Sequence, residues 1–215
     1  MEQTTHDVAG WVDRIDDIAV GMTDTALRTD GSVPPPTVHL VLDGLDPPYV
    51  GHLTCRPMYR GDDAAAAVRA MGLMGSMLGA ARLVVAYEND DLCTALELPD
   101  ADQAPPGVVV IDADRDGHEA RWQPVRFHRG PPNAAGGATV LPEWGPGLRY
   151  PRGLPLPQPV ADLLETWRAP RVWSEVEFLR AFAAMEVGGY AMRWVTRPEG
   201  ERDQPAWMRL LAPIM

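Results

Sequence analysis

The sequence contains no lysine, and all 19 of its basic residues are arginines. Three classes of enzyme depend on a lysine amine: nucleotide-binding proteins with a Walker-type phosphate loop, enzymes that form a Schiff base with pyridoxal phosphate, and protein kinases. The lack of lysine excludes all three for this sequence.

Serine is nearly as scarce, and the sequence holds only Ser32, Ser76 and Ser174. None of them lies in the G-x-S-x-G turn that exposes the nucleophile of α/β-hydrolases, so a serine hydrolase of that type is excluded. The two cysteines, Cys55 and Cys93, form no C-x-x-C pair. The sequence therefore favours two buried thiols over a disulfide scaffold, a zinc ribbon or a thioredoxin-type site.

Basic charge is in the minority, because 30 acidic residues give a formal net charge of −11. A field of this sign repels phosphate backbones, so nucleic acid is not expected as a partner. The most apolar segment, residues 64–87, is interrupted by Arg69 and Arg82, which favours a helix followed by a strand over a membrane span. The first ten residues also lack the pattern of a secretory signal. We therefore expect a soluble, cytoplasmic protein with no membrane partner.

The rest of the composition is typical of one globular domain, with 215 residues that are 46% hydrophobic and 23% charged. Periodic apolar residues predict an amphipathic helix near the N-terminus, and alternating large residues favour a further strand near the C-terminus. The expected regions are an N-terminal helix at 1–30, a mixed α/β core at 37–130, a Gly/Pro-rich packed connection at 131–158, and a helical C-terminal region at 159–215.

The core region predicts strands and helices in the order β-β-α-β-α-β. An apolar helix that begins after residues 61–63 separates a strand within 49–59 from a buried strand at 82–88. A helical crossover of this kind makes two strands parallel. A shorter helix then leads to a strand at 107–112. We therefore expect an α/β or α+β fold: a mixed, partly parallel sheet of about five strands flanked by helices, with a helical C-terminal third.

Two histidines are predicted to face each other across the first pair of strands. If Leu42 lies opposite Tyr49 around the Gly/Asp/Pro turn, His39 lies opposite His52, while Tyr49 lies on the other face of the sheet. A pair of histidines could bind a transition metal, but no third ligand is evident. The sequence favours a polar or helix-covered face at this point.

The stretch "GVVVIDADRDGHEARWQPV", residues 107–125, ends a predicted strand with Asp112, Asp114 and Asp116. The pattern D-x-D-x-D-G matches the first six positions of a calcium-binding EF-hand loop. The twelfth position is Gln123, where such a loop needs a bidentate carboxylate, and the preceding segment is a strand instead of a helix. A Ca²⁺ site is one alternative for this stretch.

A Mg²⁺ site is a second alternative. Glu88 ends one predicted strand while Asp112 and Asp114 end another, and this arrangement looks like the Glu and D-x-D motifs of Toprim domains. The resemblance covers residues 82–120 and implies a divalent-metal-dependent phosphoryl-transfer or hydrolytic enzyme, with these three carboxylates as metal ligands. Asp116 is a metal-ligand candidate through the calcium-loop pattern. The short separation of Glu88 and Asp112 leaves no room for the helices and strand that usually lie between the two motifs.

The favoured interpretation of the stretch is a Gly/Asp turn followed by an antiparallel edge strand. Under this interpretation the sequence assigns no catalytic residue and no cofactor. We therefore expect a non-enzymatic interaction or regulatory protein. Its partner would be another protein or a second copy of the chain. The candidate interface anchors are tryptophans in irregular segments: Trp122, Trp144, Trp173 and Trp207. A thiol nucleophile at Cys93, near a predicted helix N-terminus, stays as a minor alternative.

Overall fold

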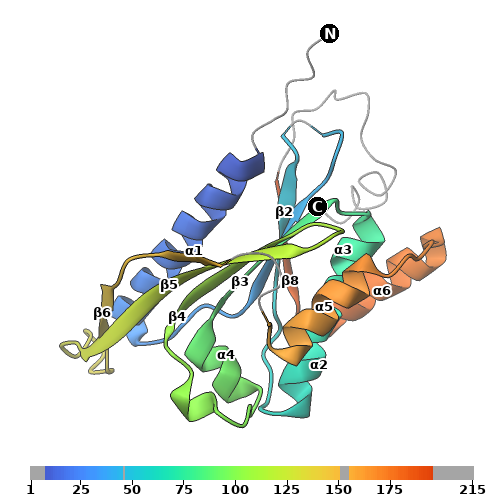
Figure 1. Cartoon of the computed structure of the whole chain (residues 1–215). Coiled ribbons are helices and arrows are strands. Elements are labelled where there is room, and N and C mark those ends of the chain that lie inside the picture. The colour runs from blue at the N-terminus through green and yellow to red at the C-terminus, as the bar shows by residue number, and fades with distance from the viewer. Residues whose placement is uncertain (1–7, 46, 151–154, 196–215) are drawn as a thin grey trace.

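The computed structural model describes residues 8–45, 47–150 and 155–195, which form one eight-stranded sheet with helices on both faces (Figure 1). The strands are β1 (Thr37–Val41), β2 (Tyr49–Thr54), β3 (Arg82–Glu88), β4 (Gly107–Ala113), β5 (His118–Arg129), β6 (Val140–Trp144), β7 (Leu148–Tyr150) and β8 (Ala191–Trp194). The helices are α1 (Val8–Asp30), α2 (Asp62–Ala70), α3 (Gly72–Leu78), α4 (Asn89–Ala95), η1 (Ala101–Gln103), α5 (Gln158–Arg168) and α6 (Glu175–Val187).

The prediction of a mixed, partly parallel sheet of about five strands is wrong, because every pair of neighbouring strands is antiparallel. The strand order is β6-β5-β4-β3-β1-β2-β8, with β7 paired to β5. The crossover through α2 and α3 does leave β2 and β3 pointing the same way. However, β1 lies between them and pairs antiparallel with both. A crossover motif predicts the relative direction of two strands, and it does not predict that they are adjacent.

The Gly/Pro-rich connection, which was not expected to contain strands, contributes β6 and β7, which pair with different parts of the long strand β5. Periodic apolar patterns are weak in these short strands, because their exposed faces carry little sequence signal. The further strand favoured near the C-terminus is present as β8, which pairs with β2 at the opposite edge of the sheet.

The main hydrophobic core lies between the sheet and helices α2, α3, α5 and α6, which gather on one side of it in Figure 1. Its fully buried side chains include Leu40, Leu53 and Trp167. The opposite face of the sheet is covered by α1, drawn in blue, whose residues Val12 and Ile15 pack on β3 and β4. The amphipathic helix expected at the N-terminus therefore covers the sheet with its apolar stripe.

Local sequence signals explain the helical layer in detail. The side chain of Ser174 accepts a hydrogen bond from the backbone N–H of Glu177, and the Glu177 side chain accepts one from the backbone N–H of Ser174, so the two residues form a capping box at the start of α6. Gly72 lets α3 approach α5 closely, because a Cβ at this position would lie 2.1 Å from the carbonyl oxygen of Leu163. The glycine in α3 thus sets the distance between two neighbouring helices of this layer.

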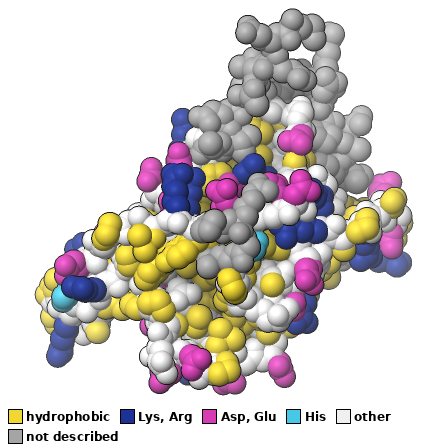
Figure 2. Space-filling view, viewed as in Figure 1, with side chains coloured by type: hydrophobic (Ala, Val, Ile, Leu, Met, Phe, Trp, Pro, Cys, Tyr) yellow, Lys and Arg dark blue, Asp and Glu magenta, His cyan; other side chains and the backbone are white. Residues whose placement is uncertain are grey.

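Within the described residues, no helix combines the length and the apolar character that crossing a bilayer requires. Arginine side chains are interleaved with carboxylates across the face of the molecule that Figure 2 presents. Trp207, one of the tryptophans predicted to anchor an interface, lies outside the described residues.

Candidate functional site

The aspartate-rich stretch forms the tip of the β4–β5 hairpin, as the favoured interpretation predicted. Oδ1 of Asp114 accepts hydrogen bonds from the backbone N–H groups of Asp116 and Gly117, at 2.9 and 2.8 Å. Arg168 of α5 donates to the backbone carbonyls of Asp114 and Gly117, which ties the turn to the helical layer. The carboxylates of this turn serve local structure.

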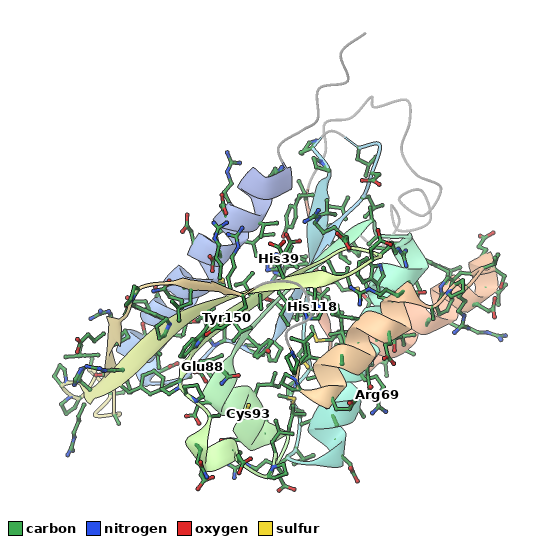
Figure 3. All side chains as sticks on the ribbon, in the orientation of Figure 1. His39, Arg69, Glu88, Cys93, His118 and Tyr150 are labelled. Atoms are coloured by element: carbon green, nitrogen blue, oxygen red, sulfur yellow. The ribbon has the colours of Figure 1, made fainter. Side chains whose placement is uncertain are left out.

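The structure does not bring Glu88 and Asp112 together. Because β3 and β4 are antiparallel, Glu88 pairs with Val108 at one end of the two strands, and Asp112 pairs with Val84 toward the other. Asp112 forms an ion pair with Arg82, with N–O distances of 2.6 and 2.7 Å. Figure 3 shows Glu88 at the end of the sheet where α4 begins, near Cys93.

The carboxylate of Glu88 is already engaged by backbone amides. It accepts hydrogen bonds from the N–H groups of Asp91 and Gly107, both at 2.7 Å, and so caps the first turn of α4. Across the described ranges, no group of three or more histidine, cysteine, aspartate or glutamate side chains is arranged to hold a metal ion. The Mg²⁺ and Ca²⁺ sites stay sequence-based predictions.

Both cysteines are buried and unpaired. Burial raises the pKa of Cys55 to about 11. The pKa of Cys93 is also raised, first by burial and then by the carboxylates of Glu88 and Asp90. A nucleophilic thiol needs a lowered pKa, so neither cysteine lies in the environment of an activated nucleophile.

The face of the sheet beneath α1 carries the residues that form the strongest candidate site. His39 of β1 lies opposite His52 of β2, as predicted. Tyr49 lies on the same face as the histidines and not on the opposite face, because a β-bulge shifts the register between Leu40 and Val41. One extra residue in a strand reverses the face of the residues beyond it. The one sequence signal for this bulge is Gly51, an isolated glycine inside β2 that adopts a positive φ of 147° next to the register shift.

A cavity of about 250 Å³ lies between α1 and this face of the sheet. Its largely apolar walls come from both layers, and polar side chains from the sheet and from α1 also line it. The lining residues are Trp11, Arg14, Ile15, Ile18, Ala19, Met22, Thr23, Pro34, Pro35, Thr37, His39, Tyr49, His52, Thr54, Ala86, Tyr87, Glu88 and Val108. Figure 3 shows His39 on the sheet near α1, and Glu88, which also lines the cavity, at the end of the sheet where α4 begins.

A chain of polar side chains runs along the floor of the cavity. The hydroxyl oxygen of Tyr49 lies 3.1 Å from Nδ1 of His39 and 3.4 Å from Nδ1 of His52. Nε2 of His39 lies 3.4 Å from the hydroxyl oxygen of Thr37. The ring of Tyr49 also stacks on Trp11 of α1, with centroids 5.2 Å apart and planes tilted by 13°. These contacts join the floor of the cavity to its helical roof.

The histidines of this chain are held uncharged by their surroundings. His39 is 8% exposed, and burial together with the neighbouring His52 lowers its pKa to about 3. Burial, followed by the charge of Arg193, also lowers the pKa of His52. Burial raises the pKa of Tyr49 to about 12. Around neutral pH the floor of the cavity therefore offers neutral donors and acceptors.

The roof of the cavity is attached to the far strands of the sheet. Arg121 of β5 forms ion pairs with Asp13 and Asp16 of α1. The indole N–H of Trp144 on β6 donates to Asp24 of α1 at 2.9 Å. α1 is thus anchored along one side, which leaves its other side to cover the histidines.

The tryptophans expected to anchor a protein interface make contacts within the chain. Trp144 binds Asp24, and the indole N–H of Trp173 donates to the Ser76 hydroxyl at 3.2 Å. The indole nitrogen of Trp122 is buried without a hydrogen-bond partner. The tryptophan that lines the candidate site is instead Trp11 of α1.

Comparisons of the chain with protein-family models, with curated proteins and with solved structures find no match.

Proposed function

We propose that this protein acts by binding and not by catalysis, and that its ligand is a small, mainly apolar molecule held in the cavity beneath α1. The observation that carries this proposal is the make-up of the cavity: largely apolar walls with a few polar groups converging on its floor. Binding sites for small molecules typically combine these two features.

The size of the cavity indicates the size of the ligand. An apolar cavity of about 150 Å³ in a protein core accommodates benzene. The cavity beneath α1 measures about 250 Å³. A molecule of one or two fused rings fits this space, whereas a nucleotide or a peptide is too large.

Two exposed side chains at the edge of the cavity support the entry of a ligand from solvent. Ile18 and Met22 of α1 line the cavity and are 53% and 54% exposed. Apolar side chains in such positions gain free energy when a ligand covers them, by about 25 cal/mol per Å² of apolar surface removed from water. The ligand can therefore enter beside α1 without unfolding the domain.

The sequence led us to expect a protein partner or a second copy of the chain. We favour a small molecule because the cavity provides a defined volume for one. We also propose a cytoplasmic location, which the free thiols of Cys55 and Cys93 support, since disulfides persist mainly in oxidising compartments.

The proposal is tested by blocking the cavity from its roof. Ala19 lines the cavity, and Ala26 lies two turns further along the same helix, outside it. Naphthalene and indole should bind the wild-type protein and Ala26→Phe, and should raise the melting temperature of both. Ala19→Phe should reduce the affinity at least about tenfold, because its ring occupies the ligand's volume. If no aromatic probe binds the wild type, or if Ala19→Phe binds equally well, the proposal is wrong.

A further inference from the structure

The floor of the cavity contains an unusual number of groups that can both donate and accept a hydrogen bond. Thr37, His39, Tyr49 and His52 form one continuous chain, in which each hydroxyl or ring is in contact with the next. We call these four residues the floor chain. Each of them can exchange the roles of donor and acceptor while it stays neutral.

The single hydroxyl hydrogen of Tyr49 constrains which nitrogen carries the hydrogen in each histidine of the floor chain. It carries a single hydrogen, and Nδ1 atoms of two histidines contact it. Tyr49 can donate to one Nδ1, and it must then accept from the other. The two neutral histidines consequently hold opposite tautomers, with hydrogen on Nδ1 in one ring and on Nε2 in the other.

Two arrangements of the floor chain satisfy this rule. In the first, His39 donates from Nδ1 to Tyr49, Tyr49 donates to Nδ1 of His52, and His52 carries its hydrogen on Nε2. In the second, every hydrogen bond is reversed: His52 donates to Tyr49, Tyr49 donates to His39, and Nε2 of His52 becomes an acceptor. Thr37 completes either arrangement, because its hydroxyl can donate to Nε2 of His39 or accept from it.

His52 is the end of the floor chain that a ligand can meet. It lines the cavity and is half-buried, and its Nδ1 is engaged by Tyr49. In the part of the chain that the structure describes, Nε2 of His52 makes no hydrogen bond and is not closed off from solvent. This atom is therefore the polar contact that remains open to a ligand.

The surroundings of the floor chain favour an uncharged ligand. Arg14 lines the rim, where it is exposed to solvent and stacks on Trp11 at 5.3 Å. Arg193 lies beside His52 on β8 and is also exposed. The carboxylate of Glu88 is occupied by the backbone amides of Asp91 and Gly107. Water screens the charges of the two exposed arginines, and the buried carboxylate of Glu88 is already satisfied by backbone N–H groups. None of the three therefore compensates for the desolvation of a charged ligand.

We propose that the ligand is an uncharged aromatic or heteroaromatic molecule whose single polar group meets Nε2 of His52, and that the floor chain reverses its hydrogen bonds to accept either a donor or an acceptor. The rings of Trp11, Tyr49, His39 and His52 provide the aromatic surface that such a ligand contacts. This inference rests on the proposed function of the cavity.

Four bicyclic probes of similar size test the inference by calorimetry at neutral pH: naphthalene without a polar group, indole with a donor, quinoline with an acceptor, and 2-naphthoate with a charge. Indole and quinoline should each bind about tenfold more tightly than naphthalene, since each gains one hydrogen bond. In His52→Phe both gains should disappear, so that indole and quinoline bind no more tightly than naphthalene binds to the same variant.

A spectroscopic readout separates reversal of the floor chain from simple contact. Nitrogen-15 NMR of the histidine rings should show His52 protonated on Nδ1 and His39 on Nε2 in the indole complex. Both assignments should exchange in the quinoline complex. Tyr49→Phe should remove the coupling, so that the tautomer of His39 no longer follows the ligand bound at His52.

The possible outcomes distinguish the two proposals. If none of the four probes binds, the proposed function itself fails. If naphthalene binds as tightly as indole and quinoline, the cavity binds ligands but the polar contact at His52 is refuted. Preferential binding of 2-naphthoate overturns the uncharged ligand, and a preference for only one of indole and quinoline overturns the reversal.

Discussion

His39 and His52 face each other across two neighbouring strands, with ring centroids 5.3 Å apart, and the Tyr49 hydroxyl contacts both rings. Like-charged imidazolium rings at this separation would repel each other, and burial penalises the charge of either one. The pair is therefore compatible with the folded protein only while both rings are neutral, which makes the fold sensitive to acid.

Acid should destabilise the protein through His39. Its pKa falls from 6.5 to about 3 on folding. Below pH 6.5 the unfolded chain therefore binds a proton at His39, whereas the folded chain does not. The free energy of unfolding should then decrease by up to about 1.4 kcal/mol for each pH unit below 6.5, until the pH approaches the folded pKa. Urea melts of the wild type and of His39→Gln measure the difference, and the variant should show the smaller pH dependence. Equal slopes in the wild type and His39→Gln would contradict the prediction.

Gly72→Ala should destabilise the protein by about 1–3 kcal/mol, because the new methyl group would overlap the Leu163 carbonyl oxygen and push α3 away from α5. Gly21→Ala is a matched control in the middle of α1, where nothing lies within 4 Å of an added Cβ. That control should stabilise the protein by about 0.5–1 kcal/mol through helix propensity. Both values come from urea melts. A neutral Gly72→Ala would show that the two helices are not in tight contact.

Asp114→Asn should change the free energy of unfolding by less than about 0.5 kcal/mol, since an amide oxygen can accept the same two backbone hydrogen bonds as Oδ1. Asp114→Ala removes that acceptor and should cost about 1 kcal/mol. Thermal melts with and without Mg²⁺ or Ca²⁺ address the metal alternatives at the same time. A site filled to about 100 Kd would add roughly 2.7 kcal/mol, and any such ion-dependent shift lost in Asp114→Asn would favour a metal site over the turn.

Much of the local structure could be predicted from the sequence. The amphipathic pattern of α1, the Ser174–Glu177 capping box and the β4–β5 hairpin each depend on residues close together in the chain. The pairing of His39 with His52 belongs to the same group, because a short connection between two strands brings their residues into register. Local hydrogen bonds and local periodicity are sufficient to specify features of this kind.

The strand order and the candidate site were decided by tertiary structure. β3 pairs with β1 instead of β2, and no short-range pattern distinguishes these two neighbours, because both pairings bury the same apolar face. Tyr49 joins the histidines through a one-residue bulge. α1 covers them because its apolar residues pack on β3 and β4 while Asp13, Asp16 and Asp24 meet partners on β5 and β6. The sequence by itself determined that His39 and His52 lie opposite each other on a polar or helix-covered face. The cavity exists because contacts between residues about 100 positions apart hold that helix over the sheet, and the free energy of such contacts depends on the whole fold.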